Sequence, residues 1–347
     1  MRLRVRLCFF LMCLLFCSTS RSHGQPSEPK QLTVGPVGYG QYQTVQEAID
    51  HASSDHGAII LIAAGTYHEK VSVTKPNIAL VGSGNTPSDT VITWGDSAKN
   101  TGSTFKSGTI TVSADRFEAE NLTIVNTWWQ DHTAAEDRSQ AVALQMESDR
   151  AVIDRVRIIS GQDTLNASSR ACHGDLTSPC QADRQFFNDC FIEGNVDYIF
   201  GDSKAVFDHC ELHSRPGYGA MVTAQSRHSP LEDSGYYMLH CRITGDNQNN
   251  KIFLGRPWRD YATVLFYDTE IVQKIDPAGW SEWGGRLKTA TYREYKSHGP
   301  GVDGGNRSVV SPSLTPNEEK QLTATALLGG TDHWDPDADV QQLRRVR

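Results

Sequence analysis

The sequence lacks the cysteine and histidine spacings that hold structural or catalytic metals. It contains no C-x-x-C pair and no H-E-x-x-H motif, because the one similar stretch, at His68-Glu69, has no second histidine. We therefore expect no metal site, and nothing in the sequence indicates a cofactor.

Long apolar runs are also missing, apart from one near the N-terminus. Residues 7–17 are eleven apolar or cysteine residues, preceded by a basic segment and followed by a polar stretch that begins at Ser18. A retained membrane anchor, the alternative reading, needs a longer run of about 20 residues. The pattern predicts a signal peptide at 1–24, a secreted protein (extracellular or cell wall) and no membrane association.

Charge is sparse and mostly acidic. Charged residues make up 21% of the chain, and the formal net charge is −8. Removal of the predicted signal peptide takes away four arginines and no acid, which leaves −12. Since nucleic acids and anionic membranes repel such a protein, neither is an expected partner.

Linkers rich in proline or serine are absent after residue 24, and the chain instead repeats one short phrase. Each copy reads polar, small or apolar, polar, aliphatic, which is the two-residue period of a β-strand. The copies are Asn121-Leu122-Thr123-Ile124, Arg155-Val156-Arg157-Ile158, Asp189-Cys190-Phe191-Ile192, His209-Cys210-Glu211-Leu212, His240-Cys241-Arg242-Ile243 and Asp268-Thr269-Glu270-Ile271. They start 34, 34, 20, 31 and 28 residues apart, which is too close for βαβ units.

A solenoid of strands fits this spacing. We predict an all-β fold: one domain over 25–347 that forms a single-stranded right-handed parallel β-helix with short helical end caps. The second and fourth residues of the phrase are expected to stack as two inward ladders. Capping boxes at 44–47 and 315–318 predict the cap helices, the first reaching about Ala52 and the second stopping at Gly329.

Eight cysteines are present, and three of them leave with the signal peptide. Cys172 and Cys180 share one loop and are expected to form a disulfide, whereas Cys190, Cys210 and Cys241 occupy one inward ladder as small apolar residues. A second bridge between Cys190 and Cys210 is the alternative.

Two aspartates stand at the same offset on neighbouring copies of the repeat. Asp163 and Asp197 each follow their ladder isoleucine by five residues. Because adjacent coils lie about 4.8 Å apart, equal offsets bring the two carboxylates together. Such a pair cannot easily ionise twice, so it supplies a nucleophile or base beside an acid, whereas a lone aspartate here is usually a turn residue.

The motifs around these aspartates resemble those of the pectin methylesterases (pectinesterases). The resemblance covers nearly all of the chain after the signal peptide. It rests on six blocks in order: Gly65-Thr66-Tyr67-His68-Glu69, Gln140-Ala141-Val142-Ala143-Leu144, Gly161-Gln162-Asp163-Thr164-Leu165, Asn195-Val196-Asp197-Tyr198-Ile199-Phe200-Gly201, Met221-Val222-Thr223-Ala224-Gln225 and Leu254-Gly255-Arg256-Pro257-Trp258. This family folds as a right-handed parallel β-helix, in agreement with the repeat.

The resemblance implies a division of catalytic labour. Asp197 matches the nucleophile that attacks the methyl ester of a galacturonate unit, and Asp163 matches the acid that protonates methanol and then activates water. Gln140 and Gln162 match the amides that stabilise the oxyanion. Arg256 matches the residue that holds Asp197 ionised through a forked hydrogen bond.

The resemblance also implies substrate contacts by Gln140, Arg256, Trp258 and Thr109. Trp280 and Trp283 either extend the cleft or fill a loop core. Asn166 departs from the family, which usually has an aromatic residue after Leu165.

The expected function is hydrolysis of methyl esters in pectin (homogalacturonan), with release of methanol. A proteinaceous pectinesterase inhibitor is a candidate partner, and a monomer is expected. The alternatives are another pectin-acting β-helix enzyme, a lyase or polygalacturonase, whose characteristic acidic and Gly-His-Gly elements we do not find, or a non-catalytic pectin-binding β-helix.

Overall fold

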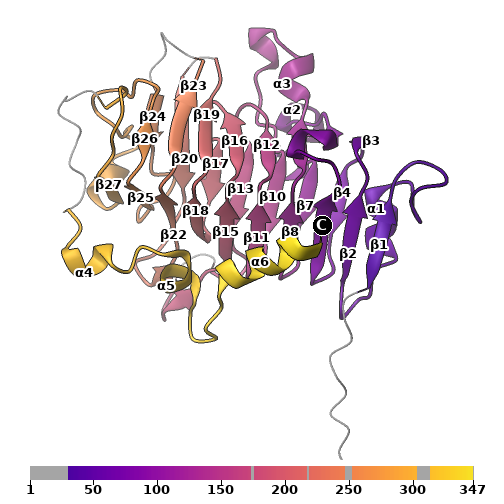
Figure 1. The fold of residues 1–347 in the computed structure, drawn as a ribbon. Helices are drawn as coiled ribbons and strands as arrows, with labels where there is room; N and C mark the ends of the chain where they lie inside the picture. Colours follow the sequence, from indigo (N-terminus) through magenta and orange to yellow (C-terminus); the bar gives the residue numbers. More distant parts are fainter. Residues whose placement is uncertain (1–29, 173–175, 217–218, 247–251, 303–312, 347) are drawn as a thin grey trace, which may run out of the picture.

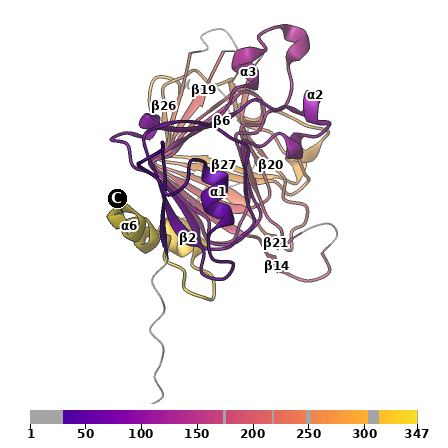
Figure 2. The same ribbon diagram turned by 90° about the vertical axis from the view of Figure 1, so that its right-hand side faces the viewer.

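The chain winds into a column of stacked coils whose strands form three long parallel sheets (Figures 1 and 2). The computed structural model describes residues 30–172, 176–216, 219–246, 252–302 and 313–346. Most coils contribute one strand to each sheet, so the parallel β-helix predicted from the repeat is confirmed. The predicted signal peptide lies outside the described residues, and within them no helix is long and apolar enough to cross a membrane.

The three sheets run the length of the column. The ten-stranded sheet contains β1 (Gln31–Val34), β2 (Ala58–Ile62), β5 (Ile78–Gly82), β8 (Glu118–Glu120), β11 (Ala151–Asp154), β15 (Arg184–Asn188), β18 (Lys204–Asp208), β22 (Gly235–Leu239), β25 (Thr263–Tyr267) and β27 (Thr291–Tyr295). The eight-stranded sheet contains β3 (Gly65–His68), β6 (Thr90–Trp94), β9 (Thr123–Asn126), β12 (Arg157–Ile159), β16 (Phe191–Gly194), β19 (Glu211–Ser214), β23 (Arg242–Gly245) and β26 (Glu270–Ile271). The seven-stranded sheet contains β4 (Val71–Val73), β7 (Ile110–Val112), β10 (Leu144–Glu147), β13 (Leu165–Ser168), β17 (Ile199–Gly201), β20 (Ala220–Gln225) and β24 (Ile252–Gly255). A small separate sheet pairs β14 (Cys180–Gln181) with β21 (Glu232–Asp233).

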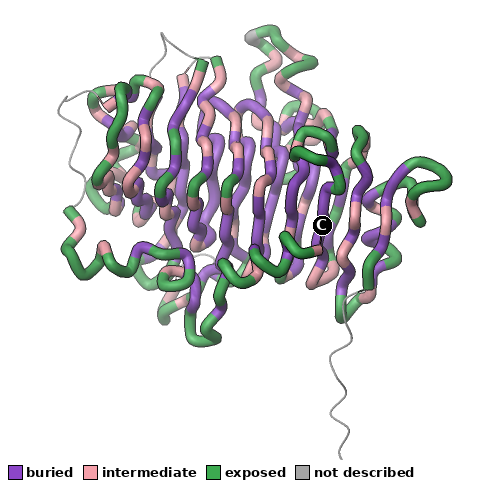
Figure 3. Tube along the Cα trace, in the orientation of Figure 1, coloured by how far each residue is buried: buried purple, intermediate pink, exposed green. Residues whose placement is uncertain are grey.

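The repeated phrase marks the same corner of successive coils. Its aliphatic fourth residues pair in register along the eight-stranded sheet: Ile124, Ile158, Ile192, Leu212, Ile243 and Ile271. Its second residues, Leu122, Val156, Cys190, Cys210, Cys241 and Thr269, are buried as well. Both predicted ladders are therefore present, and the strands in the middle of the column are largely purple, the colour of buried residues, in Figure 3.

The alternation had predicted that the first residue of the phrase lies in a strand, and this is wrong. It occupies the corner between the ten-stranded and eight-stranded sheets in the left-handed conformation, with φ between 49° and 53°, at Asn121, Arg155, Asp189, His209, His240 and Asp268. A single residue with positive φ turns the chain sharply, and asparagine and aspartate adopt this conformation more readily than most residues. The polar position of the repeat thus reflects a bend rather than an outward strand residue.

The cysteines divide as predicted. Cys172 and Cys180 form a disulfide, and Cys190, Cys210 and Cys241 are buried free thiols. The alternative bridge between Cys190 and Cys210 is not formed. Burial raises the pKa of the Cys190 and Cys210 thiols well above the usual range, which keeps both neutral.

Peptide mapping of the unreduced protein is expected to recover one cross-linked peptide, joining Cys172 to Cys180. A thiol reagent should leave the ladder cysteines unmodified in the folded protein and modify all three after denaturation, because none exposes more than 2% of its surface. A peptide that links Cys172 to Cys190, Cys210 or Cys241 would contradict this assignment.

A short helix covers the N-terminal end of the column. Helix α1 (Val45–Asp50) begins where predicted, since the Thr44 side chain accepts a hydrogen bond from the Glu47 N–H. Val45, Ala48 and Ile49 are buried against the main core. The N-terminal cap is therefore confirmed.

The C-terminal cap was predicted wrongly. The capping box at Thr315 is present, but α4 (Pro316–Glu319) ends after one turn and Thr323 caps a separate helix, α5 (Ala324–Leu328). Helix α6 (Pro336–Val346) follows, and the sequence analysis had not anticipated it. Helices α5 and α6 run back along the ten-stranded sheet instead of covering its end (Figure 1).

The outer face of the ten-stranded sheet explains this course. It is apolar, with Val152, Phe186 and Val206 buried, and these side chains pack against Leu328, Trp334, Val340 and Leu343 of the C-terminal segment in a second core. Covering this surface stabilises the fold by removing apolar area from water. We call residues 324–346 the C-terminal strap.

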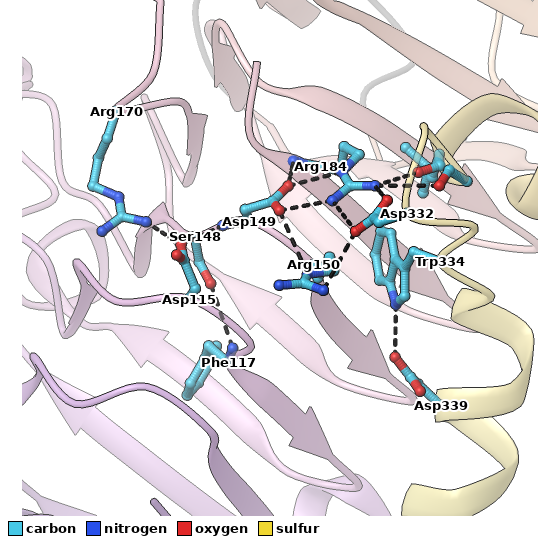
Figure 4. A network of polar contacts seen from close by, with 12 residues as sticks. Asp115, Phe117, Ser148, Asp149, Arg150, Arg170, Arg184, Asp332, Trp334 and Asp339 are labelled. Atoms are coloured by element: carbon cyan, nitrogen blue, oxygen red, sulfur yellow. Dashed lines mark hydrogen bonds and ion pairs between the residues drawn. The ribbon is translucent and has the colours of Figure 1, made fainter. Parts of the chain in front are cut away.

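Two arginines fasten the strap to the sheet. Arg184 is almost fully buried and donates hydrogen bonds to Asp149 and to Asp332, with its Nη1 2.6 Å from Asp332 Oδ1 (Figure 4). Arg344 of α6 donates to both carboxylate oxygens of Asp154, at 2.7 and 2.8 Å. Forked charge-assisted bonds of this kind are the strong class of hydrogen bond.

The other helical elements lie in loops. They are α2 (Ala98–Thr101), α3 (Trp128–Asp131), η1 (Pro87–Asp89), η2 (Thr104–Lys106), η3 (Ala135–Asp137) and η4 (Arg286–Lys288). Helices α2 and α3 project near the seven-stranded and eight-stranded sheets (Figure 2).

Asp202 should make the stability of the protein depend on pH. Burial, with smaller contributions from the charges of Glu232 and Glu147, raises the pKa of this carboxyl to about 7. Because the folded pKa lies above the unfolded one, the contribution of Asp202 to stability is complete at pH 4 and is lost as the pH rises through 7.

The matched variant Asp202→Asn keeps an oxygen for the Ser169 N–H, which Asp202 Oδ1 accepts at 2.8 Å. In denaturant titrations it should equal the wild type at pH 4 and exceed it at pH 8 by up to about 4 kcal/mol. Parallel curves for the two proteins across this range would show that Asp202 does not titrate as described.

Candidate active site

A cavity of about 290 Å³ opens on the outer face of the seven-stranded sheet. It brings together six of the residues singled out in the sequence: Gln140, Gln162, Asp163, Asp197, Arg256 and Trp258. The other lining residues are Thr104, Phe105, Phe200, Ala224 and Trp283. Sites of this kind combine an apolar lining with a few convergent polar groups.

The stacking of coils puts the two aspartates side by side. Leu165 pairs with Ile199 in neighbouring strands β13 and β17, and each aspartate precedes its paired residue by two positions. The Asp163 N–H donates to the Val196 carbonyl of the next coil at 3.0 Å. The equal offsets seen in the sequence therefore correspond to adjacent positions in one cavity.

Both aspartates have left-handed backbone conformations, with φ of 61° at Asp163 and 53° at Asp197. This conformation turns each residue sharply out of the coil just before its strand begins. The corners of the column have the same conformation, so it positions the two side chains but does not by itself mark a functional site.

Arg256 distinguishes one carboxylate from the other. Its Nε donates to Asp197 Oδ1 at 2.8 Å and its Nη2 donates to Asp197 Oδ2 at 2.6 Å. The guanidinium also lies 4.1 Å from the centre of the Trp283 ring. A planar fork held on an aromatic face leaves the Asp197 carboxylate a narrow range of orientations.

The two carboxyls differ in their tendency to hold a proton. Burial and the charge of Asp197 raise the pKa of Asp163 well above its usual range, against the opposing effects of Arg256 and a Gln162 hydrogen bond. Burial also raises the pKa of Asp197, but the Arg256 fork opposes it. Since only Asp197 has that fork, Asp163 holds the shared proton near neutral pH.

The two glutamines lie next to each other on adjacent coils. Gln140 and Gln162 form an isolated parallel bridge, and the Gln162 carbonyl accepts a hydrogen bond from the Ala141 N–H at 3.0 Å. Their side chains line the same cavity as the carboxylates. This places two neutral donors beside the aspartate pair, an arrangement suited to a developing oxyanion.

Aromatic side chains form the wall of the cavity. The Trp258 ring packs edge-on to Phe200, with ring centres 6.0 Å apart, and the centre of the Phe105 ring lies 6.5 Å from that of Phe200. Of the two uncertain tryptophans, Trp283 lines the cavity whereas Trp280 is buried in the main core.

Sequence reasoning missed Thr104, Phe105, Phe200 and Ala224 as lining residues. Phe200 and Ala224 lie inside quoted motifs, and their outward position follows from the strand alternation. Phe105 belongs to the short helix η2, where no repeat assigns a direction to its side chain. Its 48% exposure is the unusual feature, and only the structure reveals it.

The predicted substrate contact by Thr109 needs correction, and the structure also places Asn166, where the chain departs from the family. Thr109 is fully buried, and its hydroxyl donates to the Val125 carbonyl at 3.0 Å, so it does not reach the cavity. Asn166, where an aromatic was usual, is also buried, and its amide donates to the Ser168 hydroxyl. Neither side chain lines the cavity.

The chain is similar to known proteins along most of its length. The family model described as Pectinesterase matches residues 31–331. The chain belongs to the pectinesterase family. It is 36% identical over 335 residues to the probable pectinesterase/pectinesterase inhibitor 23 of Arabidopsis thaliana, covering 90% of this chain but only 54% of that relative.

Solved pectin methylesterases share the fold along almost their whole length. The carrot enzyme is 31% identical with a TM-score of 0.76, over 92% of this chain and 97% of the carrot chain. A pectin methylesterase in complex with a hexasaccharide is 26% identical with a TM-score of 0.70, over 88% of this chain and 98% of that chain.

Arg256→Lys is expected to lower kcat on methylated pectin by roughly 100-fold or more. Lysine keeps the positive charge but cannot form the fork, and displaced catalytic groups cost about this much. Arg242→Lys is the matched control, because Arg242 pairs with Glu270 at the surface, away from the cavity. Near-normal turnover in a folded Arg256→Lys protein would exclude the orienting role.

Proposed function

We propose that this protein is a secreted pectin methylesterase that hydrolyses methyl esters of galacturonate units in homogalacturonan and releases methanol. The observation that carries this proposal is the unequal pair of carboxyls, in which Arg256 holds Asp197 by a fork while Asp163 lies beside it without one. The family membership of the chain supports the substrate class.

In this mechanism the ionised Asp197 attacks the ester carbonyl carbon. The carbonyl oxygen becomes an oxyanion, and the amides of Gln140 and Gln162, which line the same cavity, are neutral donors for it. Arg256 keeps the attacking carboxylate oriented until the bond forms.

Collapse of this intermediate breaks the bond to the methoxy oxygen. Methoxide is a poor leaving group, so Asp163 gives it the proton and methanol departs, leaving an anhydride between Asp197 and the galacturonate carboxyl. Asp163, now ionised, removes a proton from water, which hydrolyses the anhydride and restores both aspartates. The sum is one ester and one water converted to one acid and methanol.

The aromatic wall suits a sugar polymer. Trp258, Phe105 and Trp283 line the cavity, and aromatic side chains supply apolar surface for packing against pyranose rings around the reacting ester. At −12, the net charge of the chain from residue 25 onward favours methylated, neutral stretches over demethylated ones. A proteinaceous inhibitor as partner, and action as a monomer, remain part of the proposal.

Methanol release from highly methylated pectin tests the function directly. The wild type should release methanol, Asp197→Asn should release none, and Asp163→Asn should be nearly inactive. Asp163→Asn should still become acylated by a nitrophenyl ester, whose leaving group needs no proton.

The pH profile of kcat should be bell-shaped, since activity falls below the pKa at which Asp197 protonates and above the one at which Asp163 ionises. Asp268→Asn is the control for the Asp163→Asn and Asp197→Asn variants, because Asp268 has the same left-handed conformation at a corner away from the cavity.

The products distinguish the alternative functions. An unsaturated product would identify a lyase, and new reducing ends would identify a polygalacturonase. A covalent adduct on Asp163 would reverse the two roles.

A further inference from the structure

Trp129, which the mechanism does not use, contacts both segments that carry the oxyanion amides. It belongs to the one-turn helix α3, in the loop between β9 and β10, and its side chain is half-buried. It does not line the cavity.

The first contact is a hydrogen bond. The Trp129 indole N–H donates to the Ser139 carbonyl at 3.0 Å, and Ser139 immediately precedes Gln140. Ser139 is itself held, because its hydroxyl accepts a hydrogen bond from the Lys99 N–H at 3.0 Å.

The second contact is with the glycine that precedes Gln162. A Cβ atom added to Gly161 would lie 2.3–2.4 Å from three atoms of the Trp129 ring, so the indole rests directly on the glycine backbone. Gly161 has no positive φ, so this close approach, rather than backbone conformation, is what requires glycine here.

Gly161 is also hydrogen-bonded to the neighbouring coil. Its carbonyl accepts hydrogen bonds from the Asn195 N–H and from the Thr164 hydroxyl, both at 3.0 Å. Asn195 begins the segment that ends in Asp197. One indole therefore contacts the residues that precede Gln140 and Gln162, and through Gly161 it is linked to the segment that contains Asp197.

We propose that Trp129 is a positioning residue that clamps the Gln140 and Gln162 segments in register, so that both amides face one oxyanion. The proposal rests on the function proposed above. The indole supplies two constraints at once: its N–H fixes the Ser139 carbonyl, and its face fixes the height of Gly161. Misplacement of catalytic groups by about 1 Å costs on the order of 100-fold in rate.

Substitution of Trp129 should lower kcat on methylated pectin without changing KM more than about twofold, since the oxyanion forms only during reaction. We expect a loss of about 10- to 100-fold for Trp129→Ala. Trp129→Phe, which keeps a ring over Gly161 but loses the N–H, should lose less.

Trp128→Phe is the matched control. The Trp128 indole also donates to a backbone carbonyl, that of Asp137 at 2.9 Å, and its ring stacks on His132 within the same loop. It should retain wild-type kcat, whereas equal losses in Trp128→Phe and Trp129→Phe would show only a general dependence on the loop.

The contact with Gly161 allows a suppression test. Gly161→Ala alone should lose activity, because the new methyl group and the indole occupy the same space. The double variant with Trp129→Ala removes the three closest contacts of that methyl group, so its kcat should match that of Trp129→Ala alone rather than the product of the two losses. Multiplying losses would overturn the proposal.

Hydrogen exchange makes the outcome independent of the esterase assay. In Trp129→Ala the amides of Ala141 and Asn195, which bond across these coils, should exchange faster than in the wild type or in Trp128→Phe. If the wild type releases no methanol but Trp129→Ala still exchanges these amides faster, the proposed function is refuted and the positioning role of Trp129 is supported. Unchanged exchange, with or without esterase activity, would refute the clamp.

Discussion

Backbone hydrogen bonds between neighbouring coils are the constraint on which the rest of this protein depends. They hold each strand in register with the next, so residues at equal offsets along the repeat face the same way one strand spacing apart. The paired carboxyls of Asp163 and Asp197, the neighbouring amides of Gln140 and Gln162 and the cysteine ladder are all consequences of that single registration. A side chain need not be placed by its own contacts when the coil beneath it is already placed.

Registration alone would make the two aspartates equivalent, and the mechanism that we propose requires that they differ. The difference comes from outside the pair, since Arg256 follows β24, two strands away from β17 in the same sheet. Its fork offsets the cost of burying one charge and leaves the other carboxyl to keep its proton. The seven-stranded sheet thus sets both the matching positions of Asp163 and Asp197 and, through Arg256, the difference in their pKa values.

The extent to which sequence predicted structure follows the same logic. The ladders, the aspartate pair and Cys172–Cys180 were accessible because local spacing determines them. The left-handed corner at Asn121 was not, because a polar residue before an apolar one reads equally as a strand or as a bend. The C-terminal strap and Phe105 depend on contacts between distant segments, for which a repeat carries no signal. Thr109 shows the converse: a residue that resembles a substrate contact of the family can still be fully buried, with its hydroxyl bonded to a backbone carbonyl.

The strap has a consequence for how the column unfolds. In a solenoid each coil touches only its neighbours, so local stabilities add and an end coil can open by itself. Helices α5 and α6 lie across strands from β18 to β8, and Arg184 and Arg344 fasten them to different coils. Opening any one of these coils would also strip the strap from the others. The strap therefore converts a series of nearest-neighbour couplings into a longer cooperative unit, and the coils that it spans include the two that carry the aspartate pair.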